Sequence, residues 1–193
     1  MGDFSFYFST GWHHIISWEA ADHLLFILAL TAIYLLSNWK QVLILVTAFT
    51  IGHSLTLALS VYKVISARDH WVEFLIPCTI IVTALFNLLL KDYEKKNLRL
   101  NYFLALFFGL IHGLGYANTI RYMMAKEDQG FGWNLFSFNL GLEAGQILVV
   151  LSILMISYLL VNTVKLKRKW WVGVLSTGAF CIALKMAMER WPL

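Results

Sequence analysis

The sequence predicts an all-α polytopic membrane protein, a bundle of about six transmembrane helices in a single transmembrane domain, residues 1–193. Hydrophobic residues make up 60% of the chain and charged residues only 13%, whereas soluble domains carry about 25% charged residues. Mean hydropathy is +0.70. The apolar residues fall into runs that are long enough, as helices, to cross a hydrocarbon core of roughly 30 Å. Most charged residues lie in the short loops between these runs.

Each apolar run predicts one span. Residues 2–18 are aromatic and amphipathic, which is typical of an interfacial lead-in to the first span. The run at 42–61 contains no Lys, Arg, Asp or Glu, and it is the clearest of the six. No internal repeat is evident, and no linker is long enough to mark a second domain. The predicted spans are residues 15–36 or 19–36, 41–61, 72–90, 101–118, 134–161 and 170–188.

The distribution of basic residues predicts the orientation. Net charge is +4, but nine Lys and Arg residues fall on one side of the predicted membrane and six on the other. The side with nine is expected to be cytoplasmic, which places both termini outside. Because the basic residues lie in short loops between spans, they indicate membrane orientation and exclude a nucleic-acid partner. The expected partners are the lipid bilayer and a metal ion, and association with a second copy of the chain stays open.

Asp22, His23, His53, His112 and Glu143 are five ionisable residues inside predicted spans, where charge is costly and usually functional. Counted from the ends of their spans at about 1.5 Å per residue, they share one layer of the membrane. Imidazoles with one or two carboxylates suit Zn, Ni, Co or Fe rather than Mg or Ca. The alternative that each histidine satisfies an interhelical hydrogen bond also stays open.

Small residues accompany two of these positions. Gly109 and Gly113 flank His112, and Gly141 and Gly145 flank Glu143. This spacing lets helix backbones approach closely, and it leaves room beside the polar groups. His13 and His14 lie at the predicted interface, where they are either solvated or form an entry site.

Five segments of the chain resemble the HupE/UreJ family of small bacterial membrane proteins. The family is associated with hydrogenase and urease accessory functions and regarded as nickel or cobalt permeases. The resemblance implies a bacterial inner membrane, so the outer side predicted above for both termini is the periplasm. It also implies a metal-handling role for His14, Asp22, His23, His53, His112 and Glu143. One departure is that seven residues separate His14 from Asp22, where the family more commonly has five. The matching segments are GWHHIISWEAADHLLFILAL, VTAFTIGHSLTLALS, VEFLIPCTIIVTALFN, FFGLIHGLGYA and FNLGLEAGQ.

Two functions fit these residues. The first is a membrane permease for a divalent transition metal of the nickel or cobalt type, with an intramembrane His/carboxylate site. The alternative is a membrane-embedded zinc metalloenzyme with a three-His site, a hydrolase or acyltransferase acting on lipid or lipoprotein. In that case Glu143 or Asp22 is the candidate general base, and Ser54 and Tyr116 are candidates for stabilising an oxyanion or orienting substrate. A dead-end pocket with a tightly held metal favours the enzyme, and a continuous polar path favours the permease.

Overall fold

The structure is a computed structural model that describes the whole chain except residues 1, 66–68, 94–97, 125–129 and 193. The described residues form helices and no strands, as the sequence predicts. The α-helices are α1 (Gly2–Ile16), α2 (Ala21–Thr31), α3 (Trp39–Val61), α4 (Asp69–Leu89), α5 (Leu98–Met124), α6 (Phe131–Ser157) and α7 (Arg168–Glu189). Shorter turns lie at Trp18–Ala20, Leu36–Asn38 and Tyr158–Thr163.

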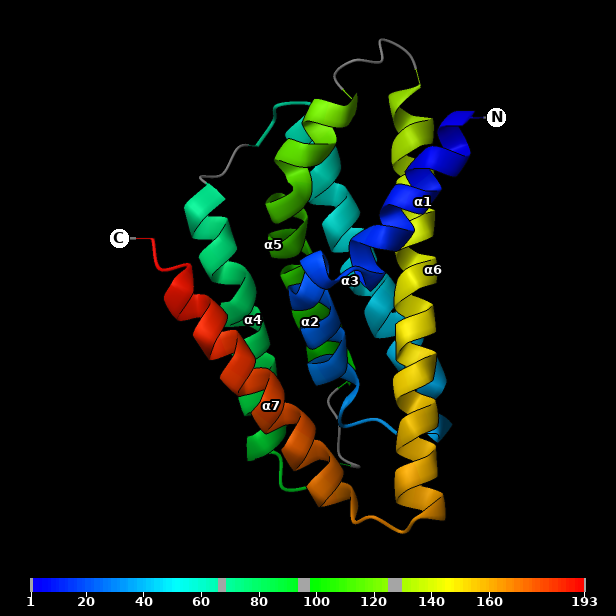
Figure 1. Cartoon of the computed structure of the whole chain (residues 1–193), viewed down its shortest axis with the longest axis vertical. Helices are drawn as coiled ribbons and strands as arrows, with labels where there is room; N and C mark the ends of the chain where they lie inside the picture. Colours follow the sequence, from blue (N-terminus) through cyan, green and yellow to red (C-terminus); the bar gives the residue numbers. More distant parts are fainter. Residues whose placement is uncertain (1, 66–68, 94–97, 125–129, 193) are drawn as a thin grey trace.

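Among the described residues, five helices are long and apolar enough to cross a membrane, and they match the second to sixth predicted spans. The first predicted span differs. It contains α2, which has only 11 residues, and α2 is separated from α1 by a turn. Ser17 has extended backbone angles (φ −72°, ψ 153°) and ends α1 there. In Figure 1 α1 runs downwards from the upper part of the molecule, and α2 continues downwards from the middle.

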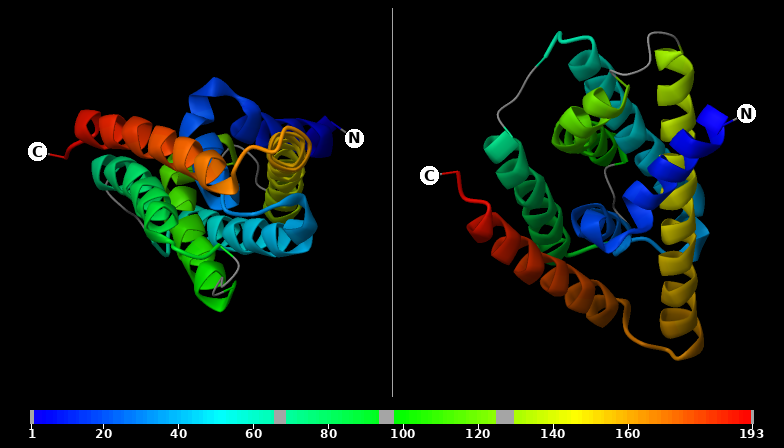
Figure 2. Two further views of the ribbon diagram at one scale, coloured as in Figure 1. Left: turned by 90° about the horizontal axis from the view of Figure 1, so that it is seen from below. Right: turned by 45° about the horizontal axis from the view of Figure 1, so that its top comes forward.

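The helices pack in pairs around α2. α3 lies along α5, α1 along α6, and α4 along α7, while α2 contacts α4, α6 and α7. Figure 2 shows α7 leaving the lower end of α6 and running back along α4. Both chain ends lie in the upper half of Figure 1.

Glycines bring two of these pairs together, α3 with α5 and α1 with α6. On α3, a Cβ added to Gly52 would overlap the carbonyl oxygen of Leu106 on α5, and a Cβ on Gly109 of α5 would overlap the carbonyl oxygen of Phe49 on α3. The prediction that glycines allow close backbone approach is therefore confirmed here. This close crossing holds the residues next to each glycine at a fixed level in the bundle.

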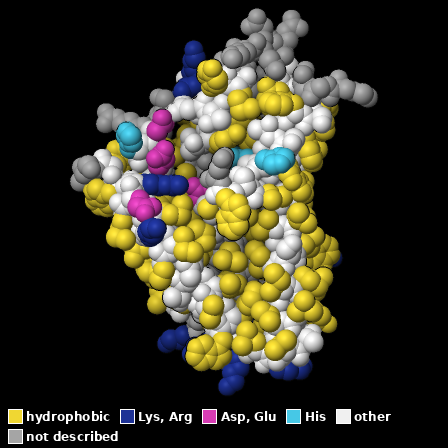
Figure 3. Space-filling model, viewed as in Figure 1, with side chains coloured by type: hydrophobic (Ala, Val, Ile, Leu, Met, Phe, Trp, Pro, Cys, Tyr) yellow, Lys and Arg dark blue, Asp and Glu magenta, His cyan; other side chains and the backbone are white. Residues whose placement is uncertain are grey.

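The surface agrees with a membrane-spanning bundle. In Figure 3, Lys and Arg side chains lie at the lower end without Asp or Glu beside them and at the upper left together with Asp and Glu, while hydrophobic side chains cover the middle. Large apolar residues on the outer faces of the spans are exposed, among them Ile51 and Val82. Residues 94–97 of the charged loop between the third and fourth predicted spans lie outside the described residues.

Candidate metal centre

The first part of the site comes from the N-terminal helices. His14 lies in the last turn of α1, just after Gly11, which packs against the backbone of α6 at Phe138. Asp22 and His23 lie in the first turn of α2, beyond the break at Ser17. Asp22 suits the beginning of a helix, because a carboxylate there interacts favourably with the helix dipole.

The second part comes from the crossing of α3 and α5. His53 follows Gly52 on α3, and His112 lies between Gly109 and Gly113 on α5. Because those glycines set the contact between the helices, both imidazoles face the interior, and their residues are 0% and 1% exposed. His14, His23, His53 and His112 together are called the histidine cluster below.

Two hydrogen bonds fix which nitrogen faces the histidine cluster. Asp22 Oδ1 lies 2.9 Å from His23 Nδ1, so that nitrogen donates to the carboxylate and Nε2 keeps its lone pair. Thr79 of α4 donates its hydroxyl proton to the carbonyl oxygen of Ile76 at 2.7 Å. Its oxygen must therefore accept from His112 Nε2, 3.0 Å away, which leaves a lone pair on Nδ1. Metal ligands are commonly oriented by such outer-shell partners.

Five other nitrogens of the histidine cluster are buried without partners among the described residues: His14 Nε2, His23 Nε2, both nitrogens of His53, and His112 Nδ1. The ring centroids of His14 and His23 are 4.7 Å apart, those of His23 and His112 are 5.0 Å apart, and His53 lies 5.8 Å from both His14 and His23. Two imidazoles that share an ion through bonds of about 2.0–2.1 Å have centroids roughly 5 Å apart.

The rings are close enough to share an ion but are not yet arranged around one position. Within the described part of the chain, no three His, Cys, Asp or Glu groups stand in metal-ligating geometry. Ligation therefore requires the rings to turn towards a common centre. Burial, with His23 as a second cause, lowers the pKa of His14, which lies outside the five candidate spans, so this ring is neutral at pH 7 and can act as a ligand.

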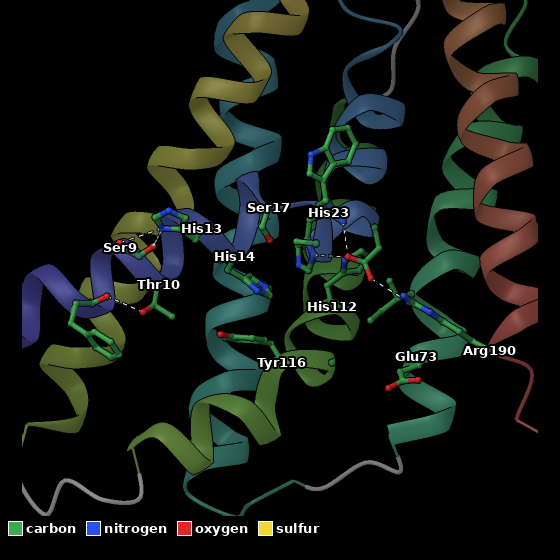
Figure 4. A pocket seen from close by; sticks show the side chains of 16 residues that line it. Ser9, Thr10, His13, His14, Ser17, His23, Glu73, His112, Tyr116 and Arg190 are labelled. Atoms are coloured by element: carbon green, nitrogen blue, oxygen red, sulfur yellow. Dashed lines mark hydrogen bonds and ion pairs between the residues drawn. The ribbon is translucent and has the colours of Figure 1, made fainter.

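A cavity of about 930 Å³ leads to the histidine cluster. His14, His23 and His112 form part of its wall, and His53 lies behind them with no exposed surface. Figure 4 shows the labelled side chains of Tyr116 and Arg190 on different sides of this cavity. The Tyr116 ring lies 4.0 Å from the His14 ring, centroid to centroid. The remaining lining residues include Phe6, Ser9, Thr10, Ser17, Trp18 and Glu73.

Three phenylalanines close the lower side of the histidine cluster, and they are called the aromatic floor below. Phe26 follows His23 by three residues, while Phe49 and Phe108 precede His53 and His112 by four. Since α2 runs down and α3 and α5 run up in Figure 1, each phenylalanine lies one turn below its histidine. Phe26 and Phe49 lie 5.2 and 5.1 Å from the His112 ring.

A second, smaller space lies beyond the aromatic floor. It has a volume of about 50 Å³, and Phe108 lines it together with Thr83, Asn87 and Asn101. The Phe108 ring is 6.0 Å from that of Phe26, and the two cavities share no lining residue. The cavity above the floor therefore ends at the histidine cluster.

Three other candidate residues have different surroundings. Glu143 on α6 accepts a hydrogen bond from Thr47 of α3 at 2.7 Å and is not part of the cavity wall. Ser54 donates to the carbonyl oxygen of Thr50 and also lies outside the wall. His13 borders the cavity but is exposed, and its Nδ1 lies 2.8 Å from the carbonyl oxygen of Ser9.

Sequence reasoning did not find Thr79, Arg190 or the aromatic floor. Arg190 follows α7, and its Nη1 lies 3.3 Å from Asp22 Oδ2. The floor had a signal in the sequence, because each phenylalanine stands three or four residues from a histidine. No signal in the sequence marks Thr79 or Arg190, because their roles depend on how α4 and α7 pack.

The fold and the site together define a polytopic membrane protein with a buried cluster of histidines at the end of a cavity. A family model described as HupE / UreJ protein matches residues 1–190. The chain therefore belongs to the HupE/UreJ family, as the resemblance implied. No curated protein and no solved structure matches it.

Proposed function

We propose that the chain is a permease for a divalent transition metal, such as Ni²⁺ or Co²⁺, and that the histidine cluster binds the ion. The observation that carries the proposal is the set of five buried imidazole nitrogens without a partner among the described residues. Each unsatisfied buried polar atom costs about 1–3 kcal/mol. A cluster of them at the end of a cavity is explained by a ligand that uses their lone pairs.

The donor chemistry favours a late transition metal. Neutral imidazoles suit Zn, Ni, Cu and Fe, whereas Mg and Ca prefer oxygen. His23 and His112 each present one free nitrogen, because Asp22 and Thr79 occupy the other. Membership of the HupE/UreJ family adds nickel or cobalt as the expected cargo. In this reading the structure has the cavity open on one side and the aromatic floor closed, which is one state of an alternating-access cycle.

A membrane-embedded zinc metalloenzyme is the second candidate, and one observation favours it. The cavity of about 930 Å³ is much larger than a metal ion needs, and it is comparable to pockets that hold small molecules. It also ends at the histidine cluster, as expected for a site where a substrate enters and leaves by the same opening. Asp22 has both carboxylate oxygens engaged, so in this reading it orients His23 rather than activating water.

The two candidates are separated by measuring binding and flux with the same protein. The purified full chain is titrated with Ni²⁺, Co²⁺ and Zn²⁺ by calorimetry, and it is also reconstituted into vesicles that contain a metal-sensing dye. A permease gives saturable flux that His23→Ala and His112→Ala abolish, while His13→Ala, outside the cluster, keeps it. Binding should weaken only at a pH well below the ordinary imidazole pKa of about 6.5, because burial lowers the pKa of His14 and protonated imidazoles cannot ligate.

An enzyme would instead retain one tightly held ion through dialysis against a chelator and give no flux. That result would refute the permease function and favour the zinc metalloenzyme. Wild-type protein that binds none of the three ions at pH 7 would remove both.

A further inference from the structure

Arg190 connects the last helix to the histidine cluster. Its guanidinium lies on the cavity wall, as Figure 4 shows, and its Nη1 is 3.3 Å from Asp22 Oδ2. The other oxygen of Asp22 accepts from His23 at 2.9 Å. A continuous chain of contacts therefore runs from α7 through Asp22 to an imidazole of the cluster.

The carboxylate of Asp22 needs a positive partner. Its side chain is only 12% exposed, and an isolated buried carboxylate is strongly unfavourable. When the cluster holds no ion, Arg190 supplies this charge. A divalent ion bound to His23 would lie next to the same carboxylate and would carry charge of the same sign as Arg190. The ion and the guanidinium therefore compete for Asp22.

We propose that Arg190 is a positioning residue that limits the metal affinity of the site, an inference that rests on the proposed function. By occupying Oδ2, it keeps Asp22 as the hydrogen-bond partner of His23 and prevents the carboxylate from turning to ligate the ion. A site of neutral imidazoles holds a divalent cation less tightly than one that adds a carboxylate. Transport needs this moderation, because an ion must leave as well as enter.

Substitutions in a binding site usually weaken binding, but removing the charge of Arg190 should strengthen the binding of the metal ion. Arg190→Gln keeps a polar side chain and removes the positive charge near the ion. Asp22 is then free to ligate, so the affinity for Ni²⁺ should rise about tenfold or more and the dissociation of Ni²⁺ should slow. Arg190→Lys restores the charge and should return the affinity to within about threefold of the wild type. A purely structural role predicts that Arg190→Gln weakens binding.

A matched control and a double variant complete the test. Lys185 also lies on α7, but its side chain is 73% exposed and pairs with Glu189 at 3.6 Å, so Lys185→Gln should leave the affinity unchanged. In an Asp22→Asn background, Arg190→Gln should change the affinity by less than about twofold, because no carboxylate remains to be freed. Affinities and dissociation rates are measured by calorimetry and stopped-flow with Ni²⁺, on variants that elute as the wild type does on size exclusion.

The possible failures differ. If the wild type binds Ni²⁺ but Arg190→Gln binds it equally or more weakly, the role of Arg190 is refuted and the proposed function stands. Equal tightening by Arg190→Gln with and without Asp22 would reduce Arg190 to a repulsive charge and also refute the inference. A wild-type protein that binds none of the ions would refute the proposed function, and the role of Arg190 would be refuted with it.

Discussion

At the scale of single residues, the histidines of the cluster differ in how they are held. His23 and His112 each use one nitrogen on a neighbour, which fixes the ring and frees the other nitrogen. His53 uses neither nitrogen in the described part of the structure, although its residue has no exposed surface. A side chain in that position costs stability, so His53 is the residue that best separates a binding role from a packing role.

His53→Leu tests this difference. Leucine has a similar size and no polar atoms, so the free energy of unfolding should stay unchanged or rise, by up to about 1–3 kcal/mol per nitrogen no longer buried unsatisfied. Metal affinity should fall by at least about tenfold, because one of the clustered ligands is lost. Thermal unfolding and metal titration of the same preparation measure the two effects. A packing role would give the reverse, with lower stability and unchanged affinity.

The sequence predicted much of the site through the cost of placing ionisable groups in a membrane. That cost identified His23, His53 and His112, and counting residues predicted that they share a layer, which is where the structure brings their rings together. Thr79 could not be identified, because a threonine in an apolar helix is common and needs no partner outside its own backbone. Glu143 shares the predicted layer but bonds to Thr47, since the direction of a side chain around its helix is not given by depth.

At the scale of helices, two crossings have the same construction. Phe8 and Gly11 of α1 meet α6 as Phe49 and Gly52 of α3 meet α5. In each case the first helix packs a glycine on a carbonyl oxygen of the second, and the second packs its own glycine on the carbonyl oxygen of the phenylalanine. The two helices of each pair approach closely at these points, and each pair carries histidines of the cluster. The positions of the rings therefore depend on these glycines.

Gly109→Ala should disturb both the packing and the site. The new methyl group would overlap the backbone oxygen of Phe49, which cannot rotate away, so we expect destabilisation of about 1–3 kcal/mol. Metal affinity should also fall, because His112 lies on the next turn of α5. Gly173→Ala on α7 is the matched control, since a Cβ there meets nothing within 4 Å and should be neutral or slightly stabilising.

The thermal unfolding midpoints of the two variants and the wild type, measured in the same detergent, test whether the close crossing of α3 and α5 stabilises the protein. Equal midpoints for Gly109→Ala and Gly173→Ala would mean that α3 and α5 separate at little cost, and the close crossing would then not hold His112 in place.

At the scale of the whole molecule, hydropathy predicted the class of fold and the positions of the long spans, but not how they pair. The spans are apolar on nearly all sides, so the sequence does not mark which face meets a neighbour. The pairing instead follows from where the small residues lie on each helix. The first predicted span became α2 and a preceding turn because hydropathy averages over a break such as the one at Ser17.

The orientation of the molecule decides which compartment supplies the metal ion. Exposed basic residues lie at the lower end, among them Lys40, Lys91 and Lys167, and the positive-inside tendency predicts that this end is cytoplasmic. The cavity opens at the other end, where α4 begins, so it should face the outside of the cell.

Cysteine labelling in intact cells tests this orientation. In a background where Cys78 and Cys181 are replaced by alanine, a single cysteine is introduced as His70→Cys, in the exposed first turn of α4, or as Lys167→Cys, in the exposed segment before α7. A membrane-impermeant maleimide should label the His70→Cys protein directly and the Lys167→Cys protein only after the membrane is permeabilised. The opposite pattern would place the cavity on the cytoplasmic side, and the histidine cluster would then take its ion from the cytoplasm and serve export or catalysis rather than uptake.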